Sequence, residues 1–153
     1  MRRLLLVLSL CAAFDFRSPD VCGRALRLSS RLRATVEPCT VGKLETMDAF
    51  QDALKNAGDA LVIVDFSTST CVPCQQFAPQ YQRVSEYYPE FHFFAVVGDD
   101  SSGAMDIMKS QGVQSVPQFH IFKRGEQVSV IAGRKALNAM DIIDEIEKHR
   151  WRK

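Results

Sequence analysis

The chain lacks the residues that a zinc module needs. A structural zinc ion takes four cysteine or histidine ligands, arranged in closely spaced pairs. This chain has one close cysteine pair, Cys71 and Cys74, and three isolated histidines, His92, His120 and His149. The sequence therefore excludes a zinc site, and we expect no metal and no cofactor. His92 and His120 lie in apolar segments and are interpreted as packing residues.

The arrangement of the cysteines and of the basic residues excludes two other classes of protein. The cysteine count is odd and only one pair is close, which excludes a small secreted domain held together by many disulfides. No dense basic patch interleaved with aromatic residues is present, which excludes a nucleic-acid-binding domain. The chain has 153 residues, of which 46% are hydrophobic and 24% charged. This composition predicts one globular domain. The cysteines are Cys11, Cys22, Cys39, Cys71 and Cys74.

The apolar stretch at the N-terminus is too short to cross a bilayer comfortably. It covers residues 4–13 and follows Arg2 and Arg3, whereas a transmembrane helix needs about 20 apolar residues. A basic start, a short apolar run and small residues before Phe14 are typical of a cleavable signal peptide. We therefore expect no stable membrane insertion after processing.

The following segment, residues 14–40, has the composition of a second targeting signal. Residues 1–40 together hold seven arginines, no lysine and three acids, and an Arg- and Ser-rich segment poor in acids is typical of organellar transit peptides. The junction of Ala13 and Phe14 between the two signals resembles the bipartite plastid presequence of algae with complex plastids. We therefore expect a presequence over residues 1–40 and a plastid location. The alternatives are a secretory signal followed by a linker, which implies the secretory pathway or the ER, and a mitochondrial presequence.

From Val41 onwards, helix and strand patterns alternate between Gly and Pro residues, which favours an α/β sheet protein. Residues 61–66 form an apolar run that only Asp65 interrupts, and this run predicts a central strand covered on both faces. The last helix is expected to bury Met140, Ile143 and Ile146. The expected helices cover residues 46–58, 73–87, 104–112 and 138–150, and the expected strands cover 61–66, 91–97, 118–123 and 127–131, the last two as an antiparallel hairpin.

Cys71 and Cys74 form a Cys-x-x-Cys motif between a buried strand and the start of a helix. The first turn of a helix has backbone N–H groups without partners and carries about half a positive charge. Both features favour the thiolate of Cys71, which we therefore expect to be the nucleophile. Cys74, one turn further along, is expected to form a disulfide with Cys71 and to act as the resolving thiol.

Several separated features in this order resemble the thioredoxin family. They are Asp65 six residues before Cys71, Pro79 in the helix after the motif, Val116-Pro117 before the hairpin, Gly125 in its turn and Gly133 after it. The resemblance implies a thioredoxin domain over residues 41–153, with a central mixed sheet of four to five strands flanked by helices on both faces. It also implies a monomeric protein-disulfide reductase of cell or organelle redox homeostasis. Such a protein acts on disulfide-containing client proteins and receives electrons from a thioredoxin reductase.

The resemblance assigns roles to residues around the two cysteines. Asp65 on an apolar strand is expected to be desolvated, which raises a carboxyl pKa, and by resemblance it accepts the proton that activates Cys74. Val116 and Pro117, where the family proline is cis, are expected to form a ledge that pairs with the backbone of a client. The other expected client contacts are Thr70, Val72 and Pro73.

The motif departs from the usual family pattern. Thr70 stands where thioredoxins usually carry Trp, and Val72 stands where they usually carry Gly, which leaves client choice and reduction potential open. Val96 stands at about the place of a buried lysine that many members have near the acid, so we expect a higher pKa for Asp65. Two other functions stay open: an ER-type disulfide oxidase or isomerase, and a thioredoxin-like binding module without turnover. Pro73, and the lack of a histidine between the cysteines, favour a reductant.

Overall fold

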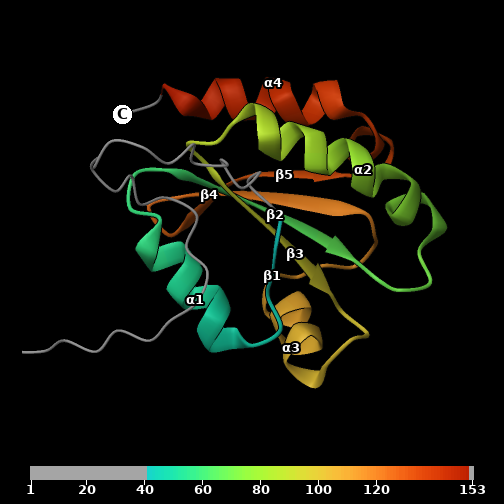
Figure 1. The fold of residues 1–153 in the computed structure, drawn as a ribbon. Helices are drawn as coiled ribbons and strands as arrows, with labels where there is room; N and C mark the ends of the chain where they lie inside the picture. Colours follow the sequence, from blue (N-terminus) through green and yellow to red (C-terminus); the bar gives the residue numbers. More distant parts are fainter. Residues whose placement is uncertain (1–40, 152–153) are drawn as a thin grey trace, which may run out of the picture.

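The computed structural model describes residues 41–151, which form a mixed sheet with helices on both faces (Figure 1). The strands are β1 (Gly42–Lys43), β2 (Leu61–Ser67), β3 (His92–Val97), β4 (Gln118–Lys123) and β5 (Glu126–Ala132). The helices are α1 (Met47–Asn56), α2 (Val72–Tyr87), α3 (Ser102–Ser110), the short 3-10 helix η1 (Gly133–Leu137) and α4 (Ala139–Arg150). The presequence expected over residues 1–40 lies outside the described residues.

The strand order in the sheet is β1-β3-β2-β4-β5. Strands β1, β3 and β2 run parallel, whereas β4 pairs antiparallel with β2 and β5 pairs antiparallel with β4. All seven residues of the central strand β2 are buried, as the apolar run in the sequence predicts. The mixed sheet of five strands between helices confirms the expected fold class.

Two separate apolar cores lie on the two faces of the sheet. Helices α2 and α4 cover one face, and α1 and α3 cover the other (Figure 1). Successive side chains of a strand point to opposite faces, so Leu61 and Ile63 of β2 join the first core while Val62 and Val64 join the second. By the same alternation Asp65 points to the face that α2 and α4 cover.

The helices begin at residues whose side chains accept backbone hydrogen bonds. Thr46 caps α1 by accepting a 3.2 Å hydrogen bond from the Ala49 N–H, at the position the sequence predicts. Ser101 does the same for Ala104 at 3.0 Å, and α3 therefore begins two residues before its predicted start.

No helix among residues 41–151 is long and apolar enough to cross a membrane.

Two expectations near the C-terminus were wrong. Met140 is 59% exposed, and Ile142 is fully buried in its place together with Ile146, because the core-facing stripe of α4 passes through 142 and 146. The hairpin turn is shorter than expected, since β5 begins at Glu126 and pairs there with Lys123. The two turn residues Arg124 and Gly125 both have positive φ, 54° and 79°, as a tight two-residue hairpin turn requires.

Candidate active site

Cys71 occupies the junction between the central strand and helix α2. Its backbone is extended, with φ −78° and ψ 92°, and it is the N-cap residue of α2. Its N–H donates to the Thr68 carbonyl at 3.1 Å, and its own carbonyl accepts from the Gln75 N–H at 3.1 Å. The Cys71 side chain therefore lies directly over the unpaired N–H groups of the first helical turn.

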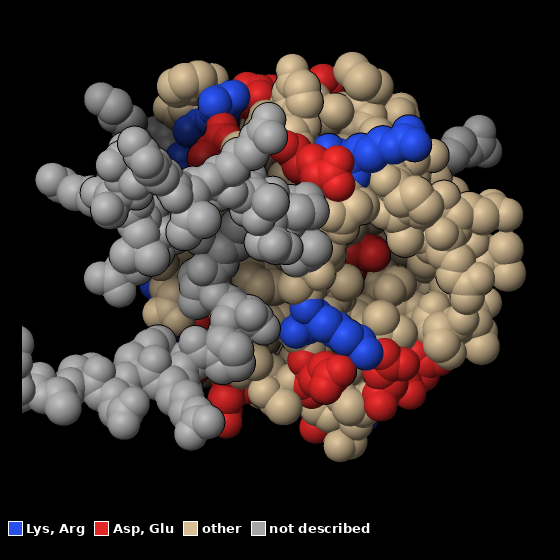
Figure 2. All heavy atoms as spheres, in the orientation of Figure 1, with Lys and Arg blue, Asp and Glu red and all other residues tan. Residues whose placement is uncertain are grey.

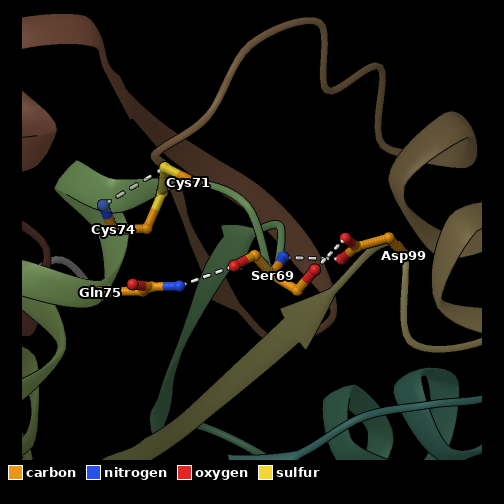
Figure 3. Close-up of a disulfide and its surroundings, with 5 residues drawn as sticks. All are labelled: Ser69, Cys71, Cys74, Gln75 and Asp99. Atoms are coloured by element: carbon orange, nitrogen blue, oxygen red, sulfur yellow. Dashed lines mark hydrogen bonds between the residues drawn. A yellow bond between two sulfur atoms is a disulfide. The ribbon is translucent and has the colours of Figure 1, made fainter.

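A disulfide joins Cys71 to Cys74, with their Cα atoms 5.3 Å apart. The Cys74 N–H donates to the Cys71 Sγ at 3.3 Å (Figure 3). Both residues are nearly buried, with 9% of Cys71 and 6% of Cys74 exposed. When the disulfide is reduced, the same N–H and the helix dipole favour a negative charge on the Cys71 sulfur, because charge-assisted hydrogen bonds are stronger than neutral ones.

Asp65 is a buried acid on the same face of the sheet as α2. It is 8% exposed, and burial raises its pKa from 3.8 to about 7. Its Oδ1 accepts no hydrogen bond from any described residue. The neighbouring Tyr81 hydroxyl donates instead to the Ile63 and Phe94 carbonyls, at 2.9 and 3.1 Å. Asp65 can therefore take up and release a proton near neutral pH.

The residue beside Asp65 on the neighbouring strand is Ala95 and not Val96. In the parallel register of β2 and β3, Asp65 pairs with Ala95, and paired residues point to the same face of a sheet. Val96 points to the opposite face and belongs to the core under α1 and α3. Val96 therefore does not stand beside Asp65, because a shift of one residue along a strand exchanges the two faces. The conclusion that no lysine stands beside Asp65 in the register is unchanged.

The expected client-contacting residues lie at the same end of the sheet. Phe66 pairs with Gln118 in the antiparallel register, so Pro117, just before β4, is next to the end of β2 and its loop. The Val116–Pro117 peptide bond is cis. Thr70 and Pro73 are exposed, Val72 is 58% exposed, Val116 is half-buried and Pro117 is buried.

The two segments that carry the cysteines and the cis proline are uncharged. Residues 66–76 and 111–119 contain no charged side chain. On the face drawn in Figure 2, most charged side chains lie toward the top and bottom, and one acidic side chain is visible in a recess right of the centre. The right-hand end, where α2 begins in Figure 1, is mostly uncharged. Contacts at this end therefore depend on apolar and main-chain groups more than on ion pairs.

Three polar residues that the sequence analysis did not single out hold the loop before Cys71. The Ser69 N–H and hydroxyl both donate to the Asp99 carboxylate, at 2.8 and 2.5 Å (Figure 3). The Gln75 side-chain amide donates to the Ser69 carbonyl at 2.6 Å. In the sequence Asp99 is one of two adjacent acids 30 residues away, and it carries no signal that distinguishes it from a solvated acid.

His120 packs on the other face of the sheet. It is 1% exposed, its ring lies 4.7 Å from that of Phe66, and burial lowers its pKa from 6.5 to about 4. Its Nε2 lies 2.8 Å from the Gln118 side-chain nitrogen. These contacts support the interpretation of His120 as a packing residue.

A pair of cysteines that closes a disulfide at the start of a helix exchanges electrons with other thiols, so the fold and the site define a thiol–disulfide oxidoreductase. The family model "Thioredoxin" matches residues 41–148. Human thioredoxin is 36% identical over 106 residues, which are 69% of this chain and 98% of the human protein. The chain belongs to the thioredoxin family, and it is a protein-disulfide reductase that acts by dithiol–disulfide exchange.

Solved structures agree with this assignment. The short form of thioredoxin f from spinach chloroplast superposes with a TM-score of 0.66 at 27% identity, and the match covers 73% of this chain and 95% of that one. A thioredoxin f2 in complex with ferredoxin:thioredoxin reductase gives a TM-score of 0.66 at 29% identity, with 72% and 96% covered.

Proposed function

We propose that Cys71 is the nucleophile and Cys74 the resolving thiol of this reductase. The Cys74 N–H at 3.3 Å from the Cys71 sulfur is the observation that carries this assignment. It supports a thiolate at Cys71, whereas Cys74 lies inside the first turn and is the less exposed of the two.

The reaction transfers two electrons to the client in two exchange steps. The Cys71 thiolate attacks a client disulfide, forms a sulfur–sulfur bond with one client cysteine and releases the other as a thiolate. Cys74 then loses its proton and attacks the Cys71 sulfur. The Cys71–Cys74 disulfide forms, and the second client sulfur leaves as a thiolate. The client is reduced and the chain is oxidised.

Asp65 is the proton acceptor for Cys74 in this proposal. A general base works best when its pKa is near the working pH, and burial raises the pKa of Asp65 to about 7. An acid of ordinary pKa would be a weaker base toward a thiol. We therefore expect Asp65→Asn to slow the second exchange step more than the first.

The client lies across Thr70, Val72, Pro73, Val116 and Pro117 in this proposal. These residues are uncharged, and those of the loop and first helical turn are exposed. A ledge beside the end of β2 offers backbone groups to an extended client strand, and such pairing depends little on client sequence. Replacing Val116 by Asp is expected to raise KM for a protein client and to leave reaction with a small disulfide unchanged.

Reduction of insulin disulfides in the presence of dithiothreitol tests the assignment. Cys71→Ser is expected to abolish catalysis, and Cys74→Ser is expected to accumulate a mixed disulfide between Cys71 and the client. Cys39→Ser, which removes a thiol outside the motif, serves as the control. Equal rates for the unmodified chain and Cys71→Ser would overturn the assignment and favour a binding module without turnover.

We also propose that residues 1–40 are a bipartite presequence and that the mature protein works in a plastid. The Arg- and Ser-rich composition supports this, as does the likeness to chloroplast thioredoxin f. A fluorescent protein fused after residue 40 is expected to enter the plastid. Fluorescence in the ER, the medium or mitochondria would overturn the plastid location.

The proposed electron donor is a thioredoxin reductase of the ferredoxin-dependent kind. The support is the likeness to a thioredoxin f2 that is bound to such a reductase. Reduction of the purified chain by ferredoxin:thioredoxin reductase, followed by thiol counting, tests this. Equilibration with glutathione separates a reductant from an oxidase, because a reduction potential well above that of the cytosolic glutathione pool favours an oxidase.

A further inference from the structure

The loop between β2 and α2 is held at Ser69 by side chains from two other elements. The Ser69 N–H and hydroxyl donate to Asp99, and the Ser69 carbonyl accepts from Gln75 (Figure 3). Gln75 belongs to the first turns of α2, while Asp99 follows the end of β3. The N–H, the hydroxyl and the carbonyl of Ser69, two residues before Cys71, therefore all have hydrogen-bond partners.

The sheet register explains why Asp99 reaches this loop. Ser67 pairs with Val97 in the parallel ladder, and the Gly98 N–H extends it by donating to the Ser67 carbonyl at 2.9 Å. The chain beyond β3 thus continues beside the chain beyond β2, and Asp99 comes level with Ser69. Because a carboxylate has two oxygens, it accepts from the amide and the hydroxyl at once.

We call the two hydrogen bonds from Ser69 to Asp99 the clamp. Its effect is expected to be largest in the reduced protein. In the oxidised form the disulfide holds Cys71 against α2. After reduction that bond is gone, and the Cys71 sulfur stays on the Cys74 N–H only if the loop keeps its place. We propose that Asp99 is a positioning residue for the nucleophile, which acts through Ser69 to keep the Cys71 thiolate on the helix N-terminus. This proposal rests on the proposed role of Cys71.

The charge of Asp99 acts against this effect. The hydroxyl and amide of Ser69 lower the pKa of Asp99, so it is an anion beside a loop that must carry a thiolate. The other charged groups nearby are Asp100, Lys43 and Glu45. Lys43 forms an ion pair with each of the two acids. If Asp99 acted only through its charge, removing it would make the Cys71 thiolate easier to form. If it acts as a clamp, removing it makes the thiolate harder to form.

Asp100 provides the matched control, because it carries the same charge one residue further on and pairs with Lys43 rather than with the loop. The reduced Asp99→Ala, Asp99→Asn and Asp100→Asn variants are alkylated with iodoacetamide across a pH series, and the pH midpoint for Cys71 is measured. We expect the Asp99→Ala midpoint to lie about half a pH unit above that of Asp100→Asn, as the loss of a hydrogen-bonded anchor predicts. Asp99→Asn keeps one oxygen and is expected to fall between them.

Equilibration with glutathione gives a second readout. Losing the clamp weakens the reduced form more than the oxidised form, so we expect Asp99→Ala to shift the equilibrium about threefold toward the disulfide relative to Asp100→Asn. Thermal unfolding of the oxidised variants checks the fold, and Ser69→Ala, which loses only the hydroxyl contact, is used if Asp99→Ala does not fold. A midpoint for Asp99→Ala equal to or below that of Asp100→Asn overturns the clamp. A Cys71→Ser variant that still reduces insulin overturns the nucleophile assignment instead.

Discussion

Asp65 should make the folded protein less stable as the pH rises toward 7. Its pKa is about 7 in the folded protein and 3.8 ordinarily, so between these values the folded chain binds more protons than the unfolded chain. The free energy of unfolding therefore falls with rising pH through this window. At about 1.4 kcal/mol per pH unit, the full effect above pH 7 is about 4 kcal/mol.

Asp65→Asn removes this titration without changing the size of the side chain. We expect the variant to gain stability over the unmodified chain as the pH rises, by about 4 kcal/mol between pH 4 and pH 8. Urea unfolding of the oxidised proteins measures the difference, since the disulfide prevents cysteine titration from contributing. Asp144→Asn is the control, because Asp144 is exposed on α4.

A stability difference between Asp65→Asn and the unmodified chain that stays constant from pH 4 to pH 8 would refute the reasoning. It would mean that the buried carboxyl finds a compensating partner, such as a trapped water, that keeps its proton affinity ordinary. The measurement is the stability difference between the variant and the unmodified chain at each pH, because His120 changes the stability of both proteins with pH in the opposite direction to Asp65. Its pKa is lowered to about 4, so the folded chain binds fewer protons there and loses stability as the pH falls from 6.5 toward 4.

Four further outcomes are expected. His120→Leu should reduce the loss of stability between pH 6.5 and 4 by about 3 kcal/mol, measured by urea unfolding, because the imidazole is 1% exposed and its pKa is about 4. Tyr81→Phe should lower stability by about 1–2 kcal/mol, since the Ile63 and Phe94 carbonyls lose their shared donor. Ile146→Ala, in the core between α4 and the sheet, should cost about 2–5 kcal/mol. Gly103→Ala should lower the melting temperature, whereas Ser102→Ala should not by a comparable amount, because a Cβ at 103 would lie 2.4 Å from the Glu45 carbonyl oxygen.

The strands and helices that bury a continuous face were predictable from the sequence. The run from Leu61 to Phe66 identified the central strand because both faces of β2 are covered. By contrast, β1 is only two residues long and exists through its pairing with β3, so no local sequence pattern predicts it. Met140 was wrongly predicted to be buried because its spacing suits a helix face. Only the packing of α4 on the sheet decides which face is buried.

The two cysteines were predictable because their chemistry is local, whereas the residues around them were not. The Cys-x-x-Cys spacing and the helix start lie within four residues. Asp99 reaches Ser69 only through the parallel register of β2 and β3, which is a tertiary relation. The same register shows that Ala95, and not Val96, stands beside Asp65, and counting along a single strand cannot settle such a relation.

The structure also explains how the site tolerates its departures from the usual family pattern. The groups that favour a thiolate at Cys71 are backbone N–H groups of α2, and replacing the usual Trp and Gly by Thr70 and Val72 leaves them in place. Ser69 and Thr70 are exposed, so burial of apolar surface cannot fix this segment. The hydrogen bonds that Ser69 donates to Asp99 and accepts from Gln75 hold the loop instead. In our proposal the contact with Asp99 positions the nucleophile.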